Sequence, residues 1–268
     1  MIYLESPPSP HLRSVIKHFW ALEHSAQTDA APEPVMPDGC IEIVFNFSDR
    51  FRRLYADGNF TLQPRTLIAG QMSRGIVIAP SGAVDLFGIR FRPSGFFSLS
   101  GLPASELTDR IEDVSDIWSS LEPLFYERLA SLRSFEERVT AFEQFVLKSF
   151  PGTNGSTTEI DHAVAMLADN MPVRRLAKDL EWSERRLERH FLRTVGVKPK
   201  LFARISRFQR LLRMLESGDA TTLADAAIAA GYYDQPHMNR DFAEFAQATP
   251  TEFRASSHRI SELFVSGG

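Results

Sequence analysis

The sequence predicts an α+β protein: an antiparallel β-barrel or sandwich with following helices, and then an all-α region in which a central helix joins two helix hairpins. Three observations lead to this prediction. Short stretches of alternating polarity run from Val15 to Arg92, separated by turn-forming residues. Beyond Pro93 the apolar residues recur at helical spacing. Near the C-terminus, a pattern of residues repeats after 51 positions.

The alternating stretches predict short strands. In CIEIVFNF (40–47), every second residue from Ile41 to Phe47 is apolar, which is typical of a strand with one face in a core. Further candidates are VIKHFWAL (15–22), TLIAG (66–70), GIVIAP (75–80) and AVDLFGIRFR (83–92). Turn formers lie at Pro37-Asp38-Gly39, Asp57-Gly58-Asn59 and Pro80-Ser81-Gly82. Short strands at this spacing predict an antiparallel barrel or sandwich.

Helices are predicted after these strands. Apolar residues from Ile117 to Leu129 mark one longer helix, and those from Phe135 to Val146 mark another. Their apolar faces must be buried either on the barrel or against a second chain. The polar run PGTNGSTTE then indicates a linker. We therefore expect an N-terminal domain (1–150), a linker (151–158), a C-terminal domain (159–256) and a tail (257–268).

The central helix is predicted at Pro199–Leu215, where about 17 residues would span about 25 Å. Its apolar residues recur three and four apart and form one stripe, made of Leu201, Ile205, Phe208, Leu212 and Leu215. Pro199 suits a first helical turn. Three arginines fall outside the stripe, at Arg207, Arg210 and Arg213.

The repeat lies on either side of this stripe. It superimposes Ser183, Leu187, Phe191, Pro199 and Phe202 on Asp234, Met238, Phe242, Pro250 and Phe253. Each copy reads as a short helix, a turn and a longer helix, with Ser183 or Asp234 as the N-cap of the longer one. Two helices joined by a short turn are the helix-turn-helix of DNA-binding proteins, whose second helix lies in the major groove.

The outward faces of the two second helices carry side chains suited to DNA. They present Glu184, Arg185, Glu188, Arg189 and Arg193 in the first copy, and Gln235, His237, Asn239 and Arg240 in the second. Arg, Asn and Gln are the residue types that pair bidentately with base edges. Between Arg174 and Arg213, thirteen Lys and Arg residues stand against four Asp and Glu residues. This surplus favours a polyanionic partner.

The segment AGYYDQPHMNRDFAEFAQATPTEFR follows the pattern G-[FY]-x-[DS]-x-x-x-[FL]-x-R-x-F and then T-P-x-x-[FY]-R. With this pattern, residues from about Pro172 to Arg254 resemble the DNA-binding domain of AraC/XylS-family transcription regulators. The resemblance implies that the second helices bind double-stranded DNA. The DNA-binding residues expected are Arg185, Arg186, Glu188, Arg189, Arg193, Gln235, Pro236, His237, Asn239 and Arg240.

Two positions depart from the family pattern. Glu181 stands where the first turn usually has Gly, and a left-handed backbone there would cost about 1–2 kcal/mol. Pro236 stands where a polar side chain is more usual, so the side chain at that position cannot form a hydrogen bond.

The first half resembles the N-terminal domain of unknown function that often precedes this kind of DNA-binding domain. The resemblance rests on MPDGCIEIVFN, AGQ, GIRFRPSGFFSLSG and ELTDRIEDVSDIW. Such domains in AraC-type regulators are usually cupin-like barrels that sense a small molecule, dimerise, or both. The resemblance therefore implies an unidentified small-molecule effector and a homodimer, with RNA polymerase as a further candidate partner.

Polar side chains on the strands are candidates for a ligand pocket. Glu42, Asn46 and Arg90 would be costly to bury alone, so those that face the interior should be paired or bind a ligand. Trp20 and Phe87 could form a wall of such a pocket. The alternative is that Glu42 and the arginines Arg90 and Arg92 lie on the solvent face of half-buried strands.

Composition excludes several other classes of protein. The single cysteine, Cys40, leaves no internal disulfide or multi-cysteine zinc site. The seven histidines never pair at ligand spacing, and the chain has no Walker loop and no G-x-S-x-G turn, so we expect no metal, no cofactor and no enzyme activity. Without a secretory leader or an apolar run of about 18 residues, we expect a soluble cytoplasmic protein with no membrane partner.

Two functions follow as hypotheses. The first is a sequence-specific transcription regulator of AraC type that reads duplex DNA through two helix-turn-helix motifs, modulated by a small molecule or by dimerisation through the N-terminal domain. The second, motivated by Glu181 and Pro236, is a small-molecule-binding or interaction module whose DNA-binding half is degenerate or constitutive.

Overall fold

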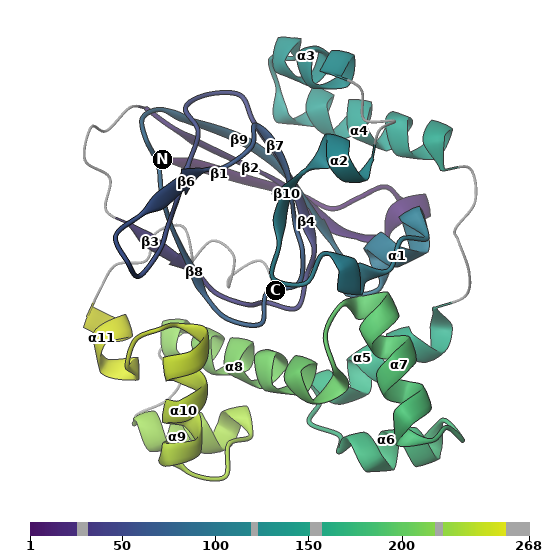
Figure 1. Cartoon of the computed structure of the whole chain (residues 1–268), viewed down its shortest axis with the longest axis vertical. Helices are drawn as coiled ribbons and strands as arrows, with labels where there is room; N and C mark the ends of the chain where they lie inside the picture. The colour runs from purple at the N-terminus through teal and green to yellow at the C-terminus, as the bar shows by residue number, and fades with distance from the viewer. Residues whose placement is uncertain (26–31, 119–122, 151–156, 218–221, 256–268) are drawn as a thin grey trace.

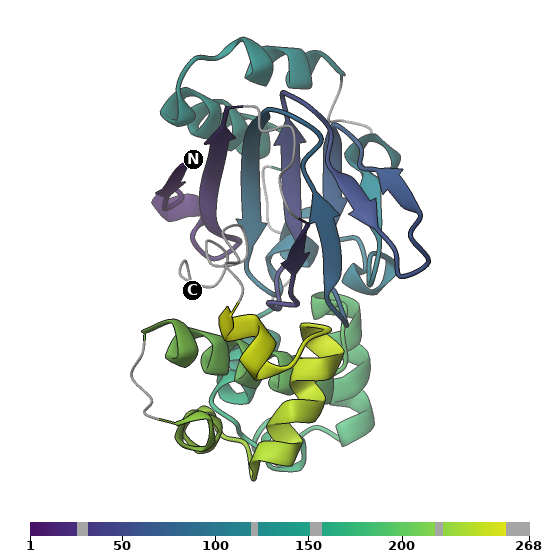
Figure 2. The same ribbon diagram turned by 90° about the vertical axis from the view of Figure 1, so that its left-hand side faces the viewer.

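The computed structural model describes residues 1–25, 32–118, 123–150, 157–217 and 222–255. Figure 1 shows a β-rich N-terminal part above an all-helical C-terminal part, and Figure 2 shows the same division after rotation. Most of the predicted linker and the predicted tail lie outside the described residues. Among the described residues, no helix combines the length and hydropathy needed to span a bilayer.

Two antiparallel sheets form the β-rich part. The six-stranded sheet has the order β1-β2-β9-β4-β7-β10 and the four-stranded sheet the order β3-β8-β5-β6. The strands are β1 (Ile2–Ser6), β2 (Ile16–His24), β3 (Glu33–Val35), β4 (Glu42–Asn46), β5 (Arg52–Leu54), β6 (Phe60–Leu62), β7 (Thr66–Ala69), β8 (Ile76–Ala79), β9 (Val84–Phe91) and β10 (Ile111–Asp113). Between the described strands, no pairing closes the two sheets into a barrel.

The five strands predicted from alternation are confirmed as β2, β4, β7, β8 and β9. The turn at Gly58, whose φ is 82°, joins β5 to β6 as the turn residues indicated. Sequence reasoning missed the other strands. Most of them have only three residues, too few for alternation to be visible, and β1 is mainly exposed.

The six-stranded sheet is buried on both faces. One face packs Phe19, Phe45 and Phe87 against helices, and the other packs Trp20 toward the four-stranded sheet. Trp20 lies directly on Gly88, where a Cβ would meet the indole at 2.0 Å. Trp20 and Phe87 therefore lie on opposite faces, and the expectation that they line one wall is wrong. Alternation could separate the two faces but could not show that both are buried.

Helices cover the outer face of this sheet. They are α1 (Gly95–Ser100), α2 (Val114–Ile117), α3 (Pro123–Ser131) and α4 (Phe135–Ser149), with short 3-10 turns η1 (Pro10–Leu12) and η2 (Ala104–Glu106). Phe142 of α4 packs edge-on against Phe19 of the sheet, with ring centroids 6.0 Å apart. The apolar stripe of α4 is thus buried on the sheet, and it no longer argues for a second chain.

The single longer helix predicted from Ile117 to Leu129 is wrong. Asp113 N-caps the short helix α2, whose last residue is Ile117, and the chain leaves helical geometry at Trp118, with φ −123° and ψ 83°. A separate helix, α3, follows, while Leu121 lies outside the described residues. Trp118 instead stacks on Phe96, with centroids 5.5 Å apart. Apolar spacing alone cannot reveal such a break.

The C-terminal part confirms two hairpins joined by a central helix. Its helices are α5 (Thr158–Ala168), α6 (Val173–Asp179), α7 (Glu184–Val195), α8 (Pro199–Ser217), α9 (Leu223–Ala230), α10 (Gln235–Phe245) and α11 (Pro250–Ala255). The first hairpin is α6 and α7, the second is α9 and α10, and α8 is the central helix. Ser183 and Asp234 cap α7 and α10 as predicted, by accepting hydrogen bonds from the backbone N–H groups of Arg186 and His237.

Both hairpins turn in the same way. The Trp182 N–H donates to the Ala177 carbonyl at 2.8 Å, and the Tyr232 N–H donates to the Ala227 carbonyl at 2.9 Å. The residue before each donor is left-handed, with φ 95° at Gly231 but φ 54° at Glu181. This is the helix end that normally requires Gly, so Glu181 adopts the strained backbone that the sequence indicated.

We expect Glu181→Gly to stabilise the protein by about 1 kcal/mol, because it removes the left-handed penalty at a small cost in chain entropy. The measurement is the free energy of unfolding in urea. Lys178→Gly, the matched change at a right-handed position in α6, should instead cost about 1 kcal/mol. Destabilisation by both changes would contradict the strain at Glu181.

Candidate nucleic-acid interface

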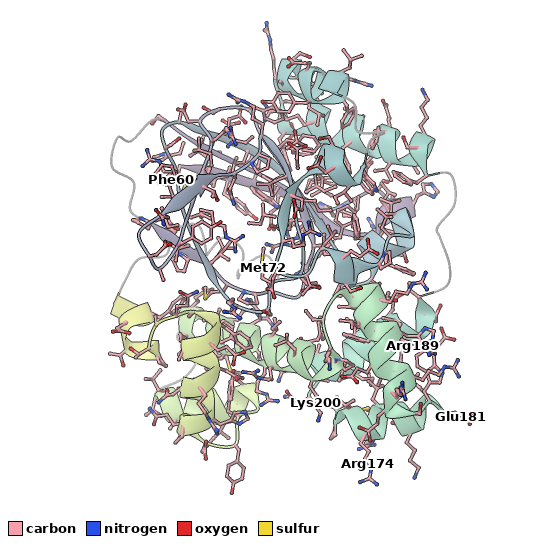
Figure 3. The ribbon with its side chains drawn as sticks, viewed as in Figure 1. Phe60, Met72, Arg174, Glu181, Arg189 and Lys200 are labelled. Carbon is pink, nitrogen blue, oxygen red and sulfur yellow. The ribbon has the colours of Figure 1, made fainter. Side chains whose placement is uncertain are left out.

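The second helix of the first hairpin, α7, has one buried and one exposed face. Leu187 and Phe191 are fully buried, whereas Arg185 and Arg189 are exposed. Figure 3 shows Arg189, with Arg174 and Glu181, at the outer surface of this hairpin. The two arginines therefore point to solvent from a helix whose rotation is fixed by its buried side.

Three other predicted residues of α7 have partners within the protein. The Glu188 carboxylate lies 3.0 Å from the Lys198 ammonium. The guanidinium of Arg186 stacks over Trp182 at 4.5 Å from the ring centroid. The guanidinium of Arg193 lies 5.6 Å from the ring of Phe97, a residue of α1 in the N-terminal part. Arg193 is therefore at the boundary between the two parts rather than beside Arg185 and Arg189.

The second helix of the second hairpin, α10, has a similar exposed face. Asn239 and Arg240 are exposed on the side of the helix away from the buried Met238 and Phe242, and Gln235 is exposed as the first residue of the helix. Their exposed side chains can meet a ligand at the outer side and the N-terminal end of α10.

Pro236 and His237 differ from this group. Pro236 occupies the first turn of α10, where a backbone N–H has no helical partner, so the proline costs no hydrogen bond. His237 is half-buried, with its Nε2 3.3 Å from Arg207 and its ring 5.2 Å from that of Tyr232. Tyr233, which the sequence reasoning did not single out, is 90% exposed in the adjacent turn.

The arginines of α8 mostly serve the protein itself. Arg210 donates to the carbonyls of Ala168 and Ala230, at the ends of α5 and α9. Arg204 binds Asp241 of α10 through two donors, at 3.0 and 2.7 Å. Arg207 and Arg210 lie outside the apolar stripe as the sequence indicated but are only partly exposed, because α8 is surrounded by helices on several sides. Fewer basic side chains are therefore available to DNA than the count between Arg174 and Arg213 indicated.

The middle of α8 contacts the N-terminal part. The loop between β3 and β4 places Met36 in the core of the second hairpin. The Gln209 side chain donates to the Pro37 carbonyl at 2.7 Å. Gly39 lies so close to Phe202 that a Cβ would meet the ring at 3.0 Å. We call residues 36–39 the docking loop.

The C-terminal ends of the two second helices contact the N-terminal part as well. Thr108 donates to the carbonyl of Gly196, the C-cap of α7. Gln247, just beyond α10, donates to the Gly75 carbonyl at 2.7 Å. The N-terminal part therefore touches both second helices and the helix that joins them.

The ligand candidates Trp20, Glu42 and Arg90 all face the space between the sheets. Arg90 is 2% exposed, and its guanidinium binds Glu42 at 2.5 Å and Asp38 of the docking loop at 3.1 Å. The alternative that Glu42 and Arg90 lie on a solvent face is therefore wrong, although Arg92 is exposed. Asn46, the last residue of β4, is buried. Its side-chain NH₂ donates to the Asp49 carbonyl, and its side-chain oxygen accepts from the Ser48 N–H, at 2.9 Å each.

Among the residues that the structure describes, no three His, Cys, Asp or Glu side chains are arranged to hold a metal ion. Cys40 is buried and packs as a small apolar residue.

Two family models match the chain. Residues 159–256 match a family described as a helix-turn-helix domain, and residues 4–113 match a family described as a domain of unknown function. No curated protein sequence matches the chain.

Two solved structures of ToxT from Vibrio cholerae are similar to the whole chain. The first is 10% identical, with a TM-score of 0.50, over 88% of this chain and 98% of ToxT. The second, bound to (E)-4-(8-methylnaphthalen-1-yl)but-3-enoic acid, is 11% identical, with a TM-score of 0.50 and the same coverage. At this identity the likeness shows a shared fold.

We expect Arg210→Met to lower the free energy of unfolding by about 2–3 kcal/mol, because two carbonyls at helix ends lose their charged donor. Arg213→Met, one turn further along α8 and exposed, should change it by less than about 0.5 kcal/mol. Urea unfolding of both variants tests this. Equal changes in the free energy of unfolding would show that the hydrogen bonds from Arg210 to α5 and α9 do not stabilise the protein.

The free energy of unfolding should depend on pH through His18, a residue of β2 that is 6% exposed. Burial, helped by the positive charges of Arg90 and Lys17, lowers the pKa of His18 to about 3. Between that value and the unfolded pKa of about 6.5, only the unfolded chain binds the proton, so stability falls as the pH drops below about 6.5. At pH 5 the loss from His18 should be about 2 kcal/mol.

His18→Gln should remove this part of the acid destabilisation, whereas His11→Gln, at an exposed position, should not. The readout is the free energy of unfolding at pH 7 and pH 5. A pH dependence that is the same in wild type and in His18→Gln would contradict the neutral, buried state of His18.

Proposed function

We propose that the protein is a DNA-binding transcription regulator of AraC type that reads duplex DNA sequence-specifically with α7 and α10 together. The match of residues 159–256 to a helix-turn-helix family supports this proposal. Arg185 and Arg189 would read one segment of the major groove, and Gln235, Asn239 and Arg240 another. Contacts to phosphate would set the register, and contacts to base edges would set the specificity.

One observation carries this proposal: both second helices expose side chains that can pair with bases, and one helix supports both. The central helix α8 has 19 residues, which gives about 28 Å at 1.5 Å per residue. Successive major-groove segments on one side of DNA are about 34 Å apart. A separation of this order allows two helices to enter adjacent groove segments.

The two departures from the family pattern do not argue for a degenerate DNA-binding half. Glu181 adopts the same left-handed turn as Gly231, at a cost in stability. Pro236 lies in a helical turn that accepts proline, and it leaves Asn239 and Arg240, three and four positions later on the same face, exposed. The geometry therefore favours the regulator over the alternative of a binding module with an inactive helical half.

We also propose that the N-terminal part modulates DNA binding by taking a small molecule. Its contacts with α8 and with the ends of α7 and α10 support this role, because a change in those contacts would move the reading helices. The fold is that of ToxT, which has been solved with an aryl butenoic acid bound. Homodimerisation and contact with RNA polymerase remain predictions from the resemblance.

Selection of bound duplexes from a random pool with the full-length protein tests the reading mechanism. The proposal expects two short conserved segments whose centres are about one helical turn apart. Selected pools with no enriched sequence, or with a single short segment, would contradict reading by both helices.

Replacing Arg240 by Ala should cost about 1–3 kcal/mol of binding free energy at the best site, if its guanidinium pairs with guanine. The loss should be smaller on a scrambled duplex. Fluorescence anisotropy at fixed salt measures both. Arg128→Ala, on α3 at the opposite end of the molecule in Figure 1, is the control and should have no effect. Equal losses on both duplexes would show that Arg240 contacts only phosphate.

A further inference from the structure

A groove lies where the four-stranded sheet meets the second hairpin. Its volume is about 830 Å³. One side is formed by β5, β8 and the loop before β8, and the other by the C-terminal part of α10 with Gln247. In Figure 1, α10 lies below β8 in agreement with this placement. The groove thus contacts both parts of the chain.

The charge in this groove is positive. Arg53 and Arg74 both line it, and within the described ranges neither guanidinium forms an ion pair with a carboxylate. The guanidinium of Arg53 is held 5.4 Å from the ring of Tyr55. Glu244 also lines the groove, but its carboxylate is bound by Arg204 at 2.5 Å. Two guanidinium groups are left to bind an anion.

The rest of the lining is largely apolar. Leu54, Ile76 and Val77 come from the sheet, Ala243 comes from α10, and the Tyr55 ring is 42% exposed at the groove. A pocket of this kind binds an apolar body through its walls and fixes its orientation through a few polar groups. Guanidinium groups suit a carboxylate or phosphate, which they can bind with two parallel hydrogen bonds.

We propose that this groove binds a small organic anion, with its carboxylate or phosphate on Arg53 and Arg74 and its hydrocarbon or aromatic body against Leu54, Ile76 and Val77. The space between the two sheets is the less suitable site for an anion. Arg90, which faces that space, is already bound by two carboxylates, whereas no carboxylate among the described residues pairs with the arginines of the groove.

Binding here would act on the second reading helix. Ala243 and Gln247 line the groove, and Ala243 follows Asn239 by four positions and Arg240 by three, so it shares their face of α10. Gly75 lies against this end of α10, since a Cβ there would meet the Phe245 carbonyl at 2.3 Å. An anion that contacts both sides would stabilise the docked arrangement, and by linkage DNA would alter its affinity. This consequence for DNA rests on the proposed function, whereas binding of the anion does not.

Calorimetry with the full-length protein tests the site. The probe is biphenyl-4-acetate, and its neutral analogue biphenyl-4-acetamide and inorganic phosphate separate the contributions of the charge and of the apolar body. We expect one molecule of biphenyl-4-acetate per chain, at least tenfold weaker binding of the amide, and weak phosphate binding that competes with the acetate. Equal affinity for the acid and the amide would overturn the proposal.

Substitutions locate the site. Arg53→Gln and Arg74→Gln should each weaken biphenyl-4-acetate binding at least tenfold. Arg52→Gln is the matched control, because Arg52 precedes Arg53 on β5 but contacts Phe60, 5.3 Å from its ring, outside the groove. Thermal unfolding checks that each variant is folded, and the uncharged Arg53→Met and Arg74→Met replace any that is not. Wild-type affinity in the Arg53 and Arg74 variants would overturn the proposal.

A DNA titration of the same variants distinguishes this inference from the proposed function. Without the probe, Arg53→Gln and Arg74→Gln should bind a selected duplex as wild type does. A tenfold loss of DNA affinity in these variants, together with no binding of the acetate by the wild-type protein, would assign both arginines to DNA phosphate and overturn the anion site. Acetate binding by a wild-type protein that does not discriminate between duplexes would contradict the proposed function and leave the site standing.

Discussion

The burial of α8 is the constraint on which the rest of the molecule depends. Its apolar residues belong to the cores of both hairpins, and Leu201 packs against the two cores at once. Arg204 then binds α10, and Arg210 binds the ends of α5 and α9. Because one helix is shared by both cores, the rotation and separation of α7 and α10 are fixed together.

The docking loop extends this constraint into the N-terminal part. Its Pro37 carbonyl binds Gln209 of α8, and its Gly39 carbonyl accepts a hydrogen bond from Gln71 at 2.6 Å. On its other side, Asp38 binds the buried Arg90. A change at Arg90, between the sheets, can therefore reach Gln209 of the central helix through Asp38 and Pro37 of the docking loop. This gives the two parts a short physical connection, consistent with control of one by the other.

Contacts within the protein divide the basic residues into two groups. Arg204, Arg207 and Arg210 are held by carboxylates, aromatic rings or carbonyls inside the helical part. Arg185, Arg189 and Arg240 point to solvent from helices whose other faces are buried. The count of basic residues alone could not make this distinction, because it depends on which helices surround α8.

The sequence by itself determined the elements whose signals are local. Periodicity located β2, β4, β7, β8 and β9 and the helices α4 and α8, and the caps at Ser183 and Asp234 fixed where α7 and α10 begin, because these features depend on residues a few positions apart. Only the tertiary structure decided the break at Trp118, the burial of both sheet faces, the partners of Arg90 and Arg210, and the groove between Arg53 and α10. Each of these depends on residues that are distant in sequence and meet only when the chain folds.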